Sequence, residues 1–274
     1  HAVELSDVVS GPAESVLTVK FAIGDSTLEQ RIALGAGSRR LDFTTRADWR
    51  ENHKLLRVEF PADLQASEGT YEIQYGFVRR PLHENTSWDK AGFEVPAQRY
   101  IDLSEHDYGA ALLNDGKYGT RIRRQCLSLS LLRAPRYPDP EADRGEQHFT
   151  FSFLPHGKCL AESGVMAEAA ALNRPPLVFP GRAGKICAPF AVEPGAVALE
   201  VVKRAEKSDA LVIRLVERTG RWAMAVLHTA LGGRLKLVET DLLEWTRGSA
   251  FQFDDGVLAL TLEPFEIKTL MTVE

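Results

Sequence analysis

Alternation of apolar and polar residues with a period of two dominates this sequence. It is clearest at 15–23, where the letters SVLTVKFAI place Leu17, Val19 and Phe21 on one face, and it recurs at 28–34. Successive side chains of a β-strand point to opposite faces, so this period predicts strands that bury one face. The same pattern predicts further strands at 55–60, 70–78, 108–113, 121–132, 147–154, 196–203, 211–217, 222–228, 234–238, 257–262 and 265–273.

One segment departs from this pattern. Residues 160–172 are rich in Ala, Glu and Met and precede Pro175 and Pro176, which predicts one short helix stopped by a proline pair. The many strands, joined by Gly, Pro and Asp turns, predict an all-β fold made of β-sandwiches. The Gly- and Pro-containing stretch 179–185 predicts a boundary. We therefore expect a large β-sandwich domain at 1–182 and a small C-terminal β-sandwich domain at 183–274.

Charge and cysteine content exclude several classes of protein. The net charge is −5 with both signs interspersed, which argues against nucleic acid and anionic membranes as partners. No apolar run approaches the roughly 20 residues that span a bilayer, and the first residues lack the pattern of a secretion signal. Cys126, Cys159 and Cys187 form no CxxC pair. Buried thiols in a reducing compartment are the simplest interpretation, so we expect a cytoplasmic protein.

Histidine spacing argues against a metal site in this chain. None of the seven histidines belongs to an HxxxH or HExxH motif. His148 and His156 would share a face of one strand, but we expect Pro155 to end that strand first. A nucleophile elbow of the GxSxG type and a phosphate-binding GxGxxG are also missing from the sequence.

Three polar segments combine charged, amide and aromatic side chains. They are RPLHENTSWD at 80–89, NDGKYG at 114–119 and the proline-stiffened RAPRYPDPEAD at 133–143. Aromatic faces beside carboxylates and amides are suited to holding a sugar, and they are equally suited to a polar domain interface. From the residues alone, both interpretations stay open.

The same segments carry a family resemblance. Residues 80–89, followed by FEVP at 93–96, resemble the RPTHxNTSWD…FEVP stretch of glycoside hydrolase family 38 α-mannosidases. YGAALLNDGKYG at 108–119, LSLLR before PDP at 129–140, and PFEIKTL at 264–270 resemble other strings of that family. The matches run in order from about residue 41 to the C-terminus. Leu82 and Gln98 stand where the family usually has Thr and His.

The resemblance implies a retaining exo-α-mannosidase, which hydrolyses terminal α-D-mannosyl residues. Its N-terminal α/β-barrel supplies two catalytic aspartates and the ligands of a zinc ion, and none of those motifs occurs here. We therefore expect a C-terminal part that starts within a large sandwich of the galactose mutarotase-like supersandwich type. It would contain no catalytic residue and no metal or other cofactor. It would shape the cleft, be inactive alone, and pack against its own N-terminal catalytic barrel, where Zn²⁺ is expected.

The resemblance also implies where a mannoside could touch this chain. An arginine directly after the strand ending at Leu132 reaches the substrate in eukaryotic relatives, so Arg133 is the first candidate for substrate binding. Asp115, Lys117 and Tyr118 are weaker candidates. The alternative for Arg133 is a structural ion pair with an acid of the same loop, Asp139 or Asp143.

The sequence can also be compared with two alternative functions, and it bears on self-association. A stand-alone carbohydrate-binding module would use exposed aromatic residues such as Trp88, Tyr118 and Tyr137. A mutarotase-like epimerase would need a His–Glu pair in one groove, whereas adjacent His83 and Glu84 would point to opposite faces of a strand. Missing first strands would leave an unpaired sheet edge, so we expect possible self-association through exposed sheet edges unless the N-terminal residues fold back over them.

Overall fold

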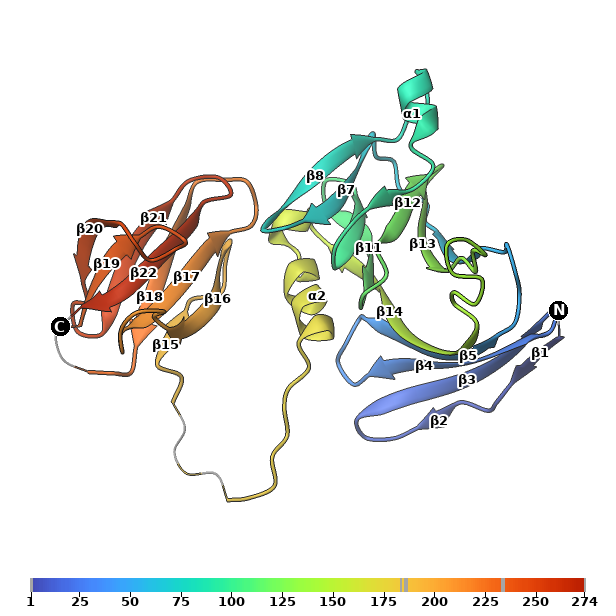
Figure 1. The fold of residues 1–274 in the computed structure, drawn as a ribbon, viewed down its shortest axis with the longest axis horizontal. Helices are drawn as coiled ribbons and strands as arrows, with labels where there is room; N and C mark the ends of the chain where they lie inside the picture. Colours follow the sequence, from blue (N-terminus) through green and yellow to red (C-terminus); the bar gives the residue numbers. More distant parts are fainter. Residues whose placement is uncertain (1, 183, 185–186, 233–234, 274) are drawn as a thin grey trace. The chain divides into compact units, whose positions relative to one another are not determined.

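The protein forms two compact units. The computed structural model describes residues 2–182, 184, 187–232 and 235–273 (Figure 1). The first unit holds the described residues up to Ile73 together with Val78–Pro176, and the second holds Gln74–Phe77 together with the described residues from Leu177 onward. Each unit contains two β-sheets, so the predicted all-β fold is confirmed. The domain boundary at 182/183 stays a prediction, because residue 183 lies outside the described residues.

The first unit is built on a ten-stranded sheet. Its order is β1-β3-β4-β5-β14-β11-β10-β7-β8, with β2 also paired to β3. The strands are β1 Ala2–Leu5, β2 Val9–Ser10, β3 Glu14–Ile23, β4 Ser26–Gly35, β5 Leu41–Trp49, β7 Glu68–Ile73, β8 Gly76–Pro81, β10 Tyr100–Ser104, β11 Tyr108–Asn114 and β14 Gly145–Gly157.

A four-stranded sheet packs over one face of the large sheet. Its order is β6-β13-β12-β9, with β6 Leu56–Pro61, β9 Val95–Pro96, β12 Gly119–Arg123 and β13 Cys126–Leu132. Between the sheets lies one apolar core that includes Trp49, Phe151 and Leu129, each at most 1% exposed. Phe43 stacks on Phe151 with ring centroids 4.9 Å apart. Alternation of apolar residues in both sheets therefore produces a sandwich, as predicted.

Strand β14 corrects one expectation. It continues through Pro155 to Gly157 and pairs with β11 up to Tyr108. Its other neighbour, β5, begins at Leu41 opposite Phe153. Pro155 therefore lies beyond the first residue of β5, where a missing backbone donor is tolerated as on an edge strand. The prediction that Pro155 ends this strand was wrong.

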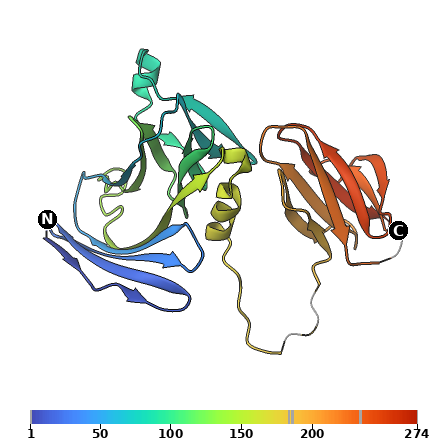
Figure 2. The same cartoon turned by 180° about the vertical axis from the view of Figure 1, so that it is seen from behind.

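The unit also contains two α-helices. The predicted helix is α2 Val165–Asn173, preceded by a 3₁₀ turn at Leu160–Glu162. It packs against β10 and β11 (Figure 1, Figure 2). A second helix, α1 Ser87–Ala91, was not predicted. Thr86 caps it through a reciprocal capping box with Asp89, so the Asn-Thr-Ser string begins a helix.

Two predicted long strands are in fact hairpins. Residues 70–78 divide at Gln74 and Tyr75 into β7 and β8, and residues 121–132 divide at Arg124 and Gln125 into β12 and β13. Tyr75, Arg124 and Gln125 all have positive φ angles, of 57°, 49° and 59°. Two-residue hairpin turns usually carry Asn or Gly at such positions, so neither turn could be recognised from its residues.

The second unit is a smaller sandwich. Its five-stranded sheet has the order β16-β17-β22-β19-β20 and its three-stranded sheet the order β15-β18-β21. The strands are β15 Phe190–Val192, β16 Val197–Arg204, β17 Leu211–Glu217, β18 Ala223–Thr229, β19 Lys236–Thr240, β20 Arg247–Gln252, β21 Val257–Leu262 and β22 Ile267–Val273. Ile213, Leu227, Leu237 and Leu262 are fully buried between the sheets.

A fully buried carboxylate closes one end of this sandwich. Glu217 accepts hydrogen bonds from the backbone N–H groups of Thr219, Gly220 and Phe265 at 2.7–2.9 Å, and from the Thr219 hydroxyl. Burial raises the pKa of this carboxyl, but the hydrogen bonds outweigh burial and hold the pKa below its ordinary value. Glu217 therefore fixes the turn after β17 to the start of the PFEIKTL segment.

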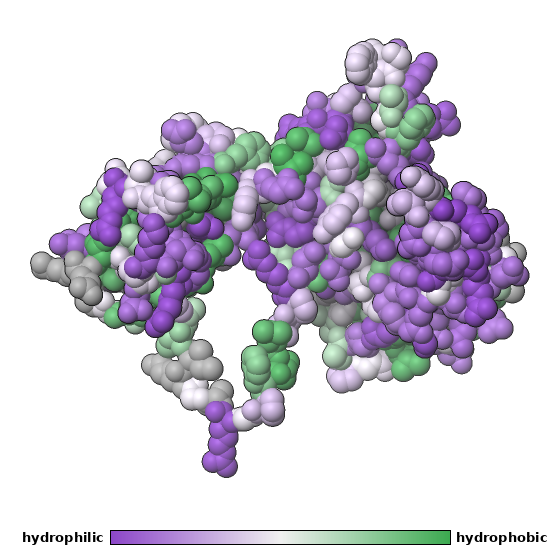
Figure 3. Space-filling model, in the orientation of Figure 1, coloured by the Kyte–Doolittle hydropathy of each residue, from purple (hydrophilic) through white to green (hydrophobic). Residues whose placement is uncertain are grey.

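Exposed apolar residues gather at several places along the chain, among them the first strands and the stretch before β15. Strands β1 and β2 expose Val3, Leu5 and Val9 beside β3. The stretch 177–179, which precedes β15, is also strongly exposed and is visible as a green segment in Figure 3. Within the described residues, no helix combines the length and the apolar character required to cross a bilayer.

Candidate functional site

The loop that follows β13 is ordered by one carboxylate. Asp143 Oδ2 accepts hydrogen bonds from the backbone N–H groups of Arg133 and Ala134 at 2.8 and 2.9 Å. The Ala134 carbonyl accepts a 2.9 Å bond from the His53 N–H, which anchors the loop to the segment after β5. Asp139 accepts from the Glu141 N–H at 2.9 Å. Asp139 and Asp143 therefore both hold backbone N–H groups of the loop, which does not suit a catalytic pair.

Arg133 itself is exposed at the mouth of a pocket of about 520 Å³. Within the described residues, no carboxylate forms an ion pair with its guanidinium, and Asp143 bonds only its backbone. Glu94, from the FEVP segment, lies in the same pocket and bonds Arg57 at 2.6 Å as well as Ser130. The pocket is lined by His53, Leu55, Glu94, Arg133, Pro135, Arg136 and Tyr137.

The second candidate loop is organised by Asn114, a residue that the sequence did not single out. Its side chain accepts from the Lys117 N–H at 3.0 Å and donates to the Gln98 carbonyl at 2.7 Å. Asp115 and Tyr118 are exposed. The Lys117 ammonium lies 5.4 Å from the centroid of the Phe149 ring, a favourable cation–π distance. The Lys117 side chain therefore contributes in part to packing within the fold.

The two loops lie at the same end of the four-stranded sheet. Strands β12 and β13 are antiparallel, with Thr120 opposite Leu129 and their connecting turn at the far end. The start of β12 at Gly119 and the end of β13 at Leu132 are therefore neighbours. Of the four predicted substrate-binding residues, Arg133 lines the pocket, whereas Asp115, Lys117 and Tyr118 do not.

The pocket offers groups that bind hydroxyls in several directions. Arg133 and Arg136 can donate hydrogen bonds, the Glu94 carboxylate can accept them, and Tyr137 presents an exposed ring. Sequence reasoning missed His53, Leu55 and Arg136. Glu94 could have been found, because it is the single acid of the quoted FEVP string.

The expected positions of His83 and Glu84 on a strand were wrong. These residues follow the end of β8 and lie in a loop, so they do not occupy opposite faces of a strand. Both line one pocket. Glu84 forms an ion pair with Arg123 at 2.5 Å, and His83 lies 3.4 Å from Asp89. Glu84 and His83 therefore each interact with a different side chain, and they do not form a pair with each other.

Metal binding has no candidate among the described residues, where no three side chains of His, Cys, Asp or Glu form a suitable group. His148 is exposed and lies 2.7 Å from Glu146. His156 is buried and bonds the buried carboxylate of Asp102 at 2.8 Å. A Cβ atom at Gly109 would lie 2.5 Å from the His156 ring, so glycine is required beside this pair.

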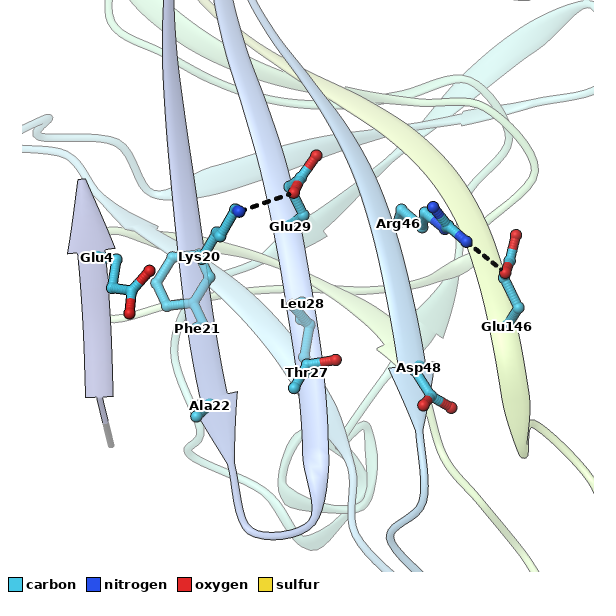
Figure 4. A pocket seen from close by; sticks show the side chains of 10 residues that line it. All are labelled: Glu4, Lys20, Phe21, Ala22, Thr27, Leu28, Glu29, Arg46, Asp48 and Glu146. Atoms are coloured by element: carbon cyan, nitrogen blue, oxygen red, sulfur yellow. Dashed lines mark hydrogen bonds and ion pairs between the residues drawn. The ribbon is translucent and has the colours of Figure 1, made fainter. Parts of the chain in front are cut away.

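A cavity of about 630 Å³ lies on the outer face of the ten-stranded sheet (Figure 4). Figure 4 shows its charged side chains paired across strands, Lys20 with Glu29 at 3.6 Å and Arg46 with Glu146 at 2.7 Å. The hydrogen bond from Arg46 holds the pKa of Glu146 below its ordinary value. Two further carboxylates, Glu4 and Asp48, also line the cavity, so its lining carries an excess of negative charge, which does not suit an anionic ligand.

Two family models and several known proteins match this chain. The family model described as the glycosyl hydrolases family 38 C-terminal domain matches residues 2–141, and that of the family 38 C-terminal beta sandwich domain matches residues 196–270. The chain is 43% identical to human alpha-mannosidase 2C1 over 256 residues, which is 91% of this chain and 24% of the relative. It is 34% identical to alpha-mannosidase G of Dictyostelium discoideum over 280 residues, 96% of this chain and 25% of the relative.

A solved structure agrees in fold. An alpha-mannosidase from Enterococcus faecalis V583 superimposes with a TM-score of 0.80 at 18% identity, covering 98% of this chain and 35% of that one. The chain thus spans about a quarter of the length of the curated relatives that it matches. Both family models that match are C-terminal domains, and together they extend over most of the described residues. The chain therefore belongs to glycosyl hydrolase family 38 and corresponds to the C-terminal β-domains of its α-mannosidases.

Proposed function

We propose that this chain forms the C-terminal part of a retaining α-mannosidase, an enzyme that removes terminal α-D-mannosyl residues. The observation that carries the proposal is the 43% identity to an α-mannosidase across 91% of the chain. The mannosides or oligosaccharides would bind between this chain and its own N-terminal catalytic barrel, which would also hold the zinc ion. This part then supports and shapes the cleft and does not carry out the chemistry.

The residues of the pocket at Arg133 support a role in shaping the cleft and not in the chemical step. Retaining hydrolysis needs two carboxylates about 5–5.5 Å apart. Among the described residues that line the pocket, Glu94 is the single carboxylate, and it is held by Arg57 and Ser130. The unpaired guanidinium of Arg133 can instead donate to sugar hydroxyls. Asp115, Lys117 and Tyr118, at the same end of the sheet, would add contacts farther from the reacting sugar.

A chimera tests this role. The residues of this chain replace the C-terminal quarter of human alpha-mannosidase 2C1, and hydrolysis of an aryl α-mannoside is measured. We expect Arg133→Ala to lower kcat/KM by about 10–100-fold, since a lost charged hydrogen bond costs about 1.5–3 kcal/mol. Arg144→Ala, which removes an arginine paired with Glu141 in the same loop, is the matched control. Full activity of the Arg133→Ala chimera would contradict the proposal, as would zinc-dependent turnover by the 274-residue chain alone.

A stand-alone carbohydrate-binding module is the alternative. Trp88 and Tyr137 are both almost fully exposed. They line different pockets, however, Trp88 beside Arg80 and Tyr137 beside Arg133, so they do not form one platform. Titration of the isolated chain with mannose and mannobiose separates the two functions, because a module binds in the millimolar range or tighter and a wall of a composite cleft does not.

A cytoplasmic location belongs to the same proposal. Cys126, Cys159 and Cys187 are free thiols, and Cys187 is exposed. Exposed free thiols persist in reducing compartments and are rare in secreted proteins. Fractionation of cells that produce the protein, with an antibody against this chain, tests the location directly.

A further inference from the structure

A second pocket, of about 290 Å³, is lined by residues of β8, α1 and β12. Four arginines line it, Arg79, Arg80, Arg121 and Arg123. A second groove shares Arg121 and Arg123 and adds Arg124, with Glu59 as its one acidic residue. The sequence as a whole carries a net charge of −5, so this concentration of positive charge reverses the sign of the molecule locally.

The carboxylates of the pocket are already engaged. Glu84 pairs with Arg123 at 2.5 Å. Asp89 caps α1 by accepting bonds from the Thr86 N–H and hydroxyl at 2.9 and 2.8 Å. The capping bonds lower the pKa of Asp89, so it stays ionised and bound to its helix. Neither acid is free to neutralise Arg80 or Arg121.

Two guanidinium groups remain without an acidic partner. Within the described residues, no carboxylate pairs with Arg80 or Arg121, and the buried Nε atom of each lacks a hydrogen-bond acceptor. The Arg80 guanidinium lies over the Tyr71 ring, 5.6 Å from its centroid. A buried donor without an acceptor is costly, so an arrangement of this kind favours a ligand that supplies acceptors.

Tyr71 adds a third donor. It is 3% exposed, and its hydroxyl oxygen accepts the Ile122 N–H at 2.9 Å. No acceptor for its own proton is found among the described residues. Burial raises the pKa of this phenol, although the Ile122 N–H and the charges of Arg80 and Arg121 act against that rise. The phenol therefore keeps its proton and can donate it into the pocket.

We propose that this pocket binds a phosphate monoester, whose oxygens accept from Arg80, Arg121 and the Tyr71 hydroxyl. A carboxylate is planar and is satisfied by a single guanidinium, whereas a phosphate offers three oxygens to donors from several directions. Trp88, at the pocket wall, presents an exposed indole on which the carbon skeleton of the ester can rest. The site is independent of the pocket at Arg133.

The test is calorimetric titration of the 274-residue chain at pH 7.5 and low salt with inorganic phosphate, mannose 6-phosphate, mannose and acetate. We expect phosphate to bind with a Kd of about 1 mM or tighter. Tighter binding of mannose 6-phosphate would identify a phosphorylated sugar, and equal binding would identify the phosphate group alone. Binding of acetate as tightly as phosphate, or the absence of phosphate binding, would overturn the proposal.

Variants locate the site. The double variant R80Q/R121Q should weaken phosphate binding at least about tenfold, and Tyr71→Phe should weaken it several-fold. Arg46→Gln, which removes an exposed arginine of another sheet face, is the matched control and should bind as the wild type does. Unchanged affinity in a folded R80Q/R121Q would refute the assignment.

A measurement on the unmodified protein covers the case in which a variant fails to fold. In nitrogen-15 spectra, phosphate should shift the Nε–Hε signals of Arg80 and Arg121 and leave that of Arg46 in place. The affinity should also fall as the pH is lowered below about 6, where the second proton of a monoester returns. Shifts confined to arginines outside the pocket would contradict the proposal.

Discussion

Glu217 and Asp102 are carboxylates that solvent hardly reaches, and the fold satisfies them in different ways. Glu217 is surrounded by backbone N–H groups of its own turn and of Phe265. Asp102 bonds the His156 ring at 2.8 Å and the Ser104 hydroxyl at 2.6 Å. Neither role could be predicted, because the decisive partners lie 48 and 54 residues away along the chain. Sequence patterns report local periodicity, and they carry no information on such pairs.

Replacing Glu217 with alanine should destabilise the second unit strongly. The change leaves the N–H groups of Thr219, Gly220 and Phe265 without their acceptor, and each unsatisfied buried group costs about 1–3 kcal/mol. We expect a loss of at least about 3 kcal/mol, measured by urea unfolding. Glu193→Ala removes an exposed glutamate of the same unit and should change stability by less than about 0.5 kcal/mol.

The same residue makes stability depend on pH in a defined direction. The folded-state pKa of Glu217 lies below its ordinary value. Its contribution is therefore complete above the unfolded pKa of about 4.3, and it is lost as the pH falls through the folded value. The difference between wild type and Glu217→Gln should shrink over that acidic range, and a difference that grows toward low pH would contradict this account.

Asp143 should control the order of the Arg133 loop. Asp143→Ala removes the acceptor of two backbone N–H groups, one of them on the buried Ala134. We expect a stability loss of about 1–3 kcal/mol and faster proteolytic cleavage within residues 133–143. Asp139→Ala, which removes a single bond to Glu141 in the same loop, is the control. Equal cleavage rates in both variants would show that Asp143 does not anchor the loop.

At the scale of elements, strands with strict alternation were predicted well and turns were not. The sequence identified β3 and β4 nearly to their ends, because alternation is read directly from neighbouring residues. It merged β12 with β13, since Arg124 and Gln125 adopt positive φ angles without the usual Asn or Gly. It also truncated β14 at Pro155, because the start of β5 near that proline is a property of the assembled sheet.

Substitutions in the β12–β13 turn should therefore be able to increase stability. Replacing Arg124 and Gln125 by Asn and Gly supplies residues that adopt positive φ readily, so we expect a gain of about 1–2 kcal/mol in the free energy of unfolding. The urea midpoint should rise with an unchanged slope. Arg124→Ala offers no such relief and should not stabilise. A loss of stability in the Asn-Gly variant would indicate that Arg124 makes a contact worth more than the strain.

For the whole molecule, the sequence predicted two sandwiches and the family, and the family matches confirm the latter. The resemblance rested on long strings with rare residues, which periodicity alone could not supply. The pocket at Arg133 could be anticipated only in part, because His53 and Glu94 reach it from the loops that precede β6 and β9. Residues that come together only when the sheets pack cannot be identified from patterns along the sequence.

Self-association is the prediction at this scale. Strand β1 covers β3 but is an edge strand itself, and it exposes Val3 and Leu5. Such an edge can pair with a second copy. We expect light scattering to show dimers or larger species at about 100 μM, and Val3→Lys to reduce them. Val257→Lys, at an exposed position of β21 in the other unit, is the control, and a strictly monomeric wild type would refute the prediction.

The place of β14 in the large sheet has a consequence for synthesis on the ribosome. Trp49 at the end of β5 pairs with Gly145 at the start of β14, so the N-terminal meander waits for about a hundred further residues before its inner edge is covered. At about 5–20 residues per second, that wait lasts roughly 5–20 s. Throughout it, β5 presents open hydrogen-bonding groups to any passing strand. The nascent chain is thus most vulnerable to misassembly in this interval, and slower translation between these strands would prolong the exposure.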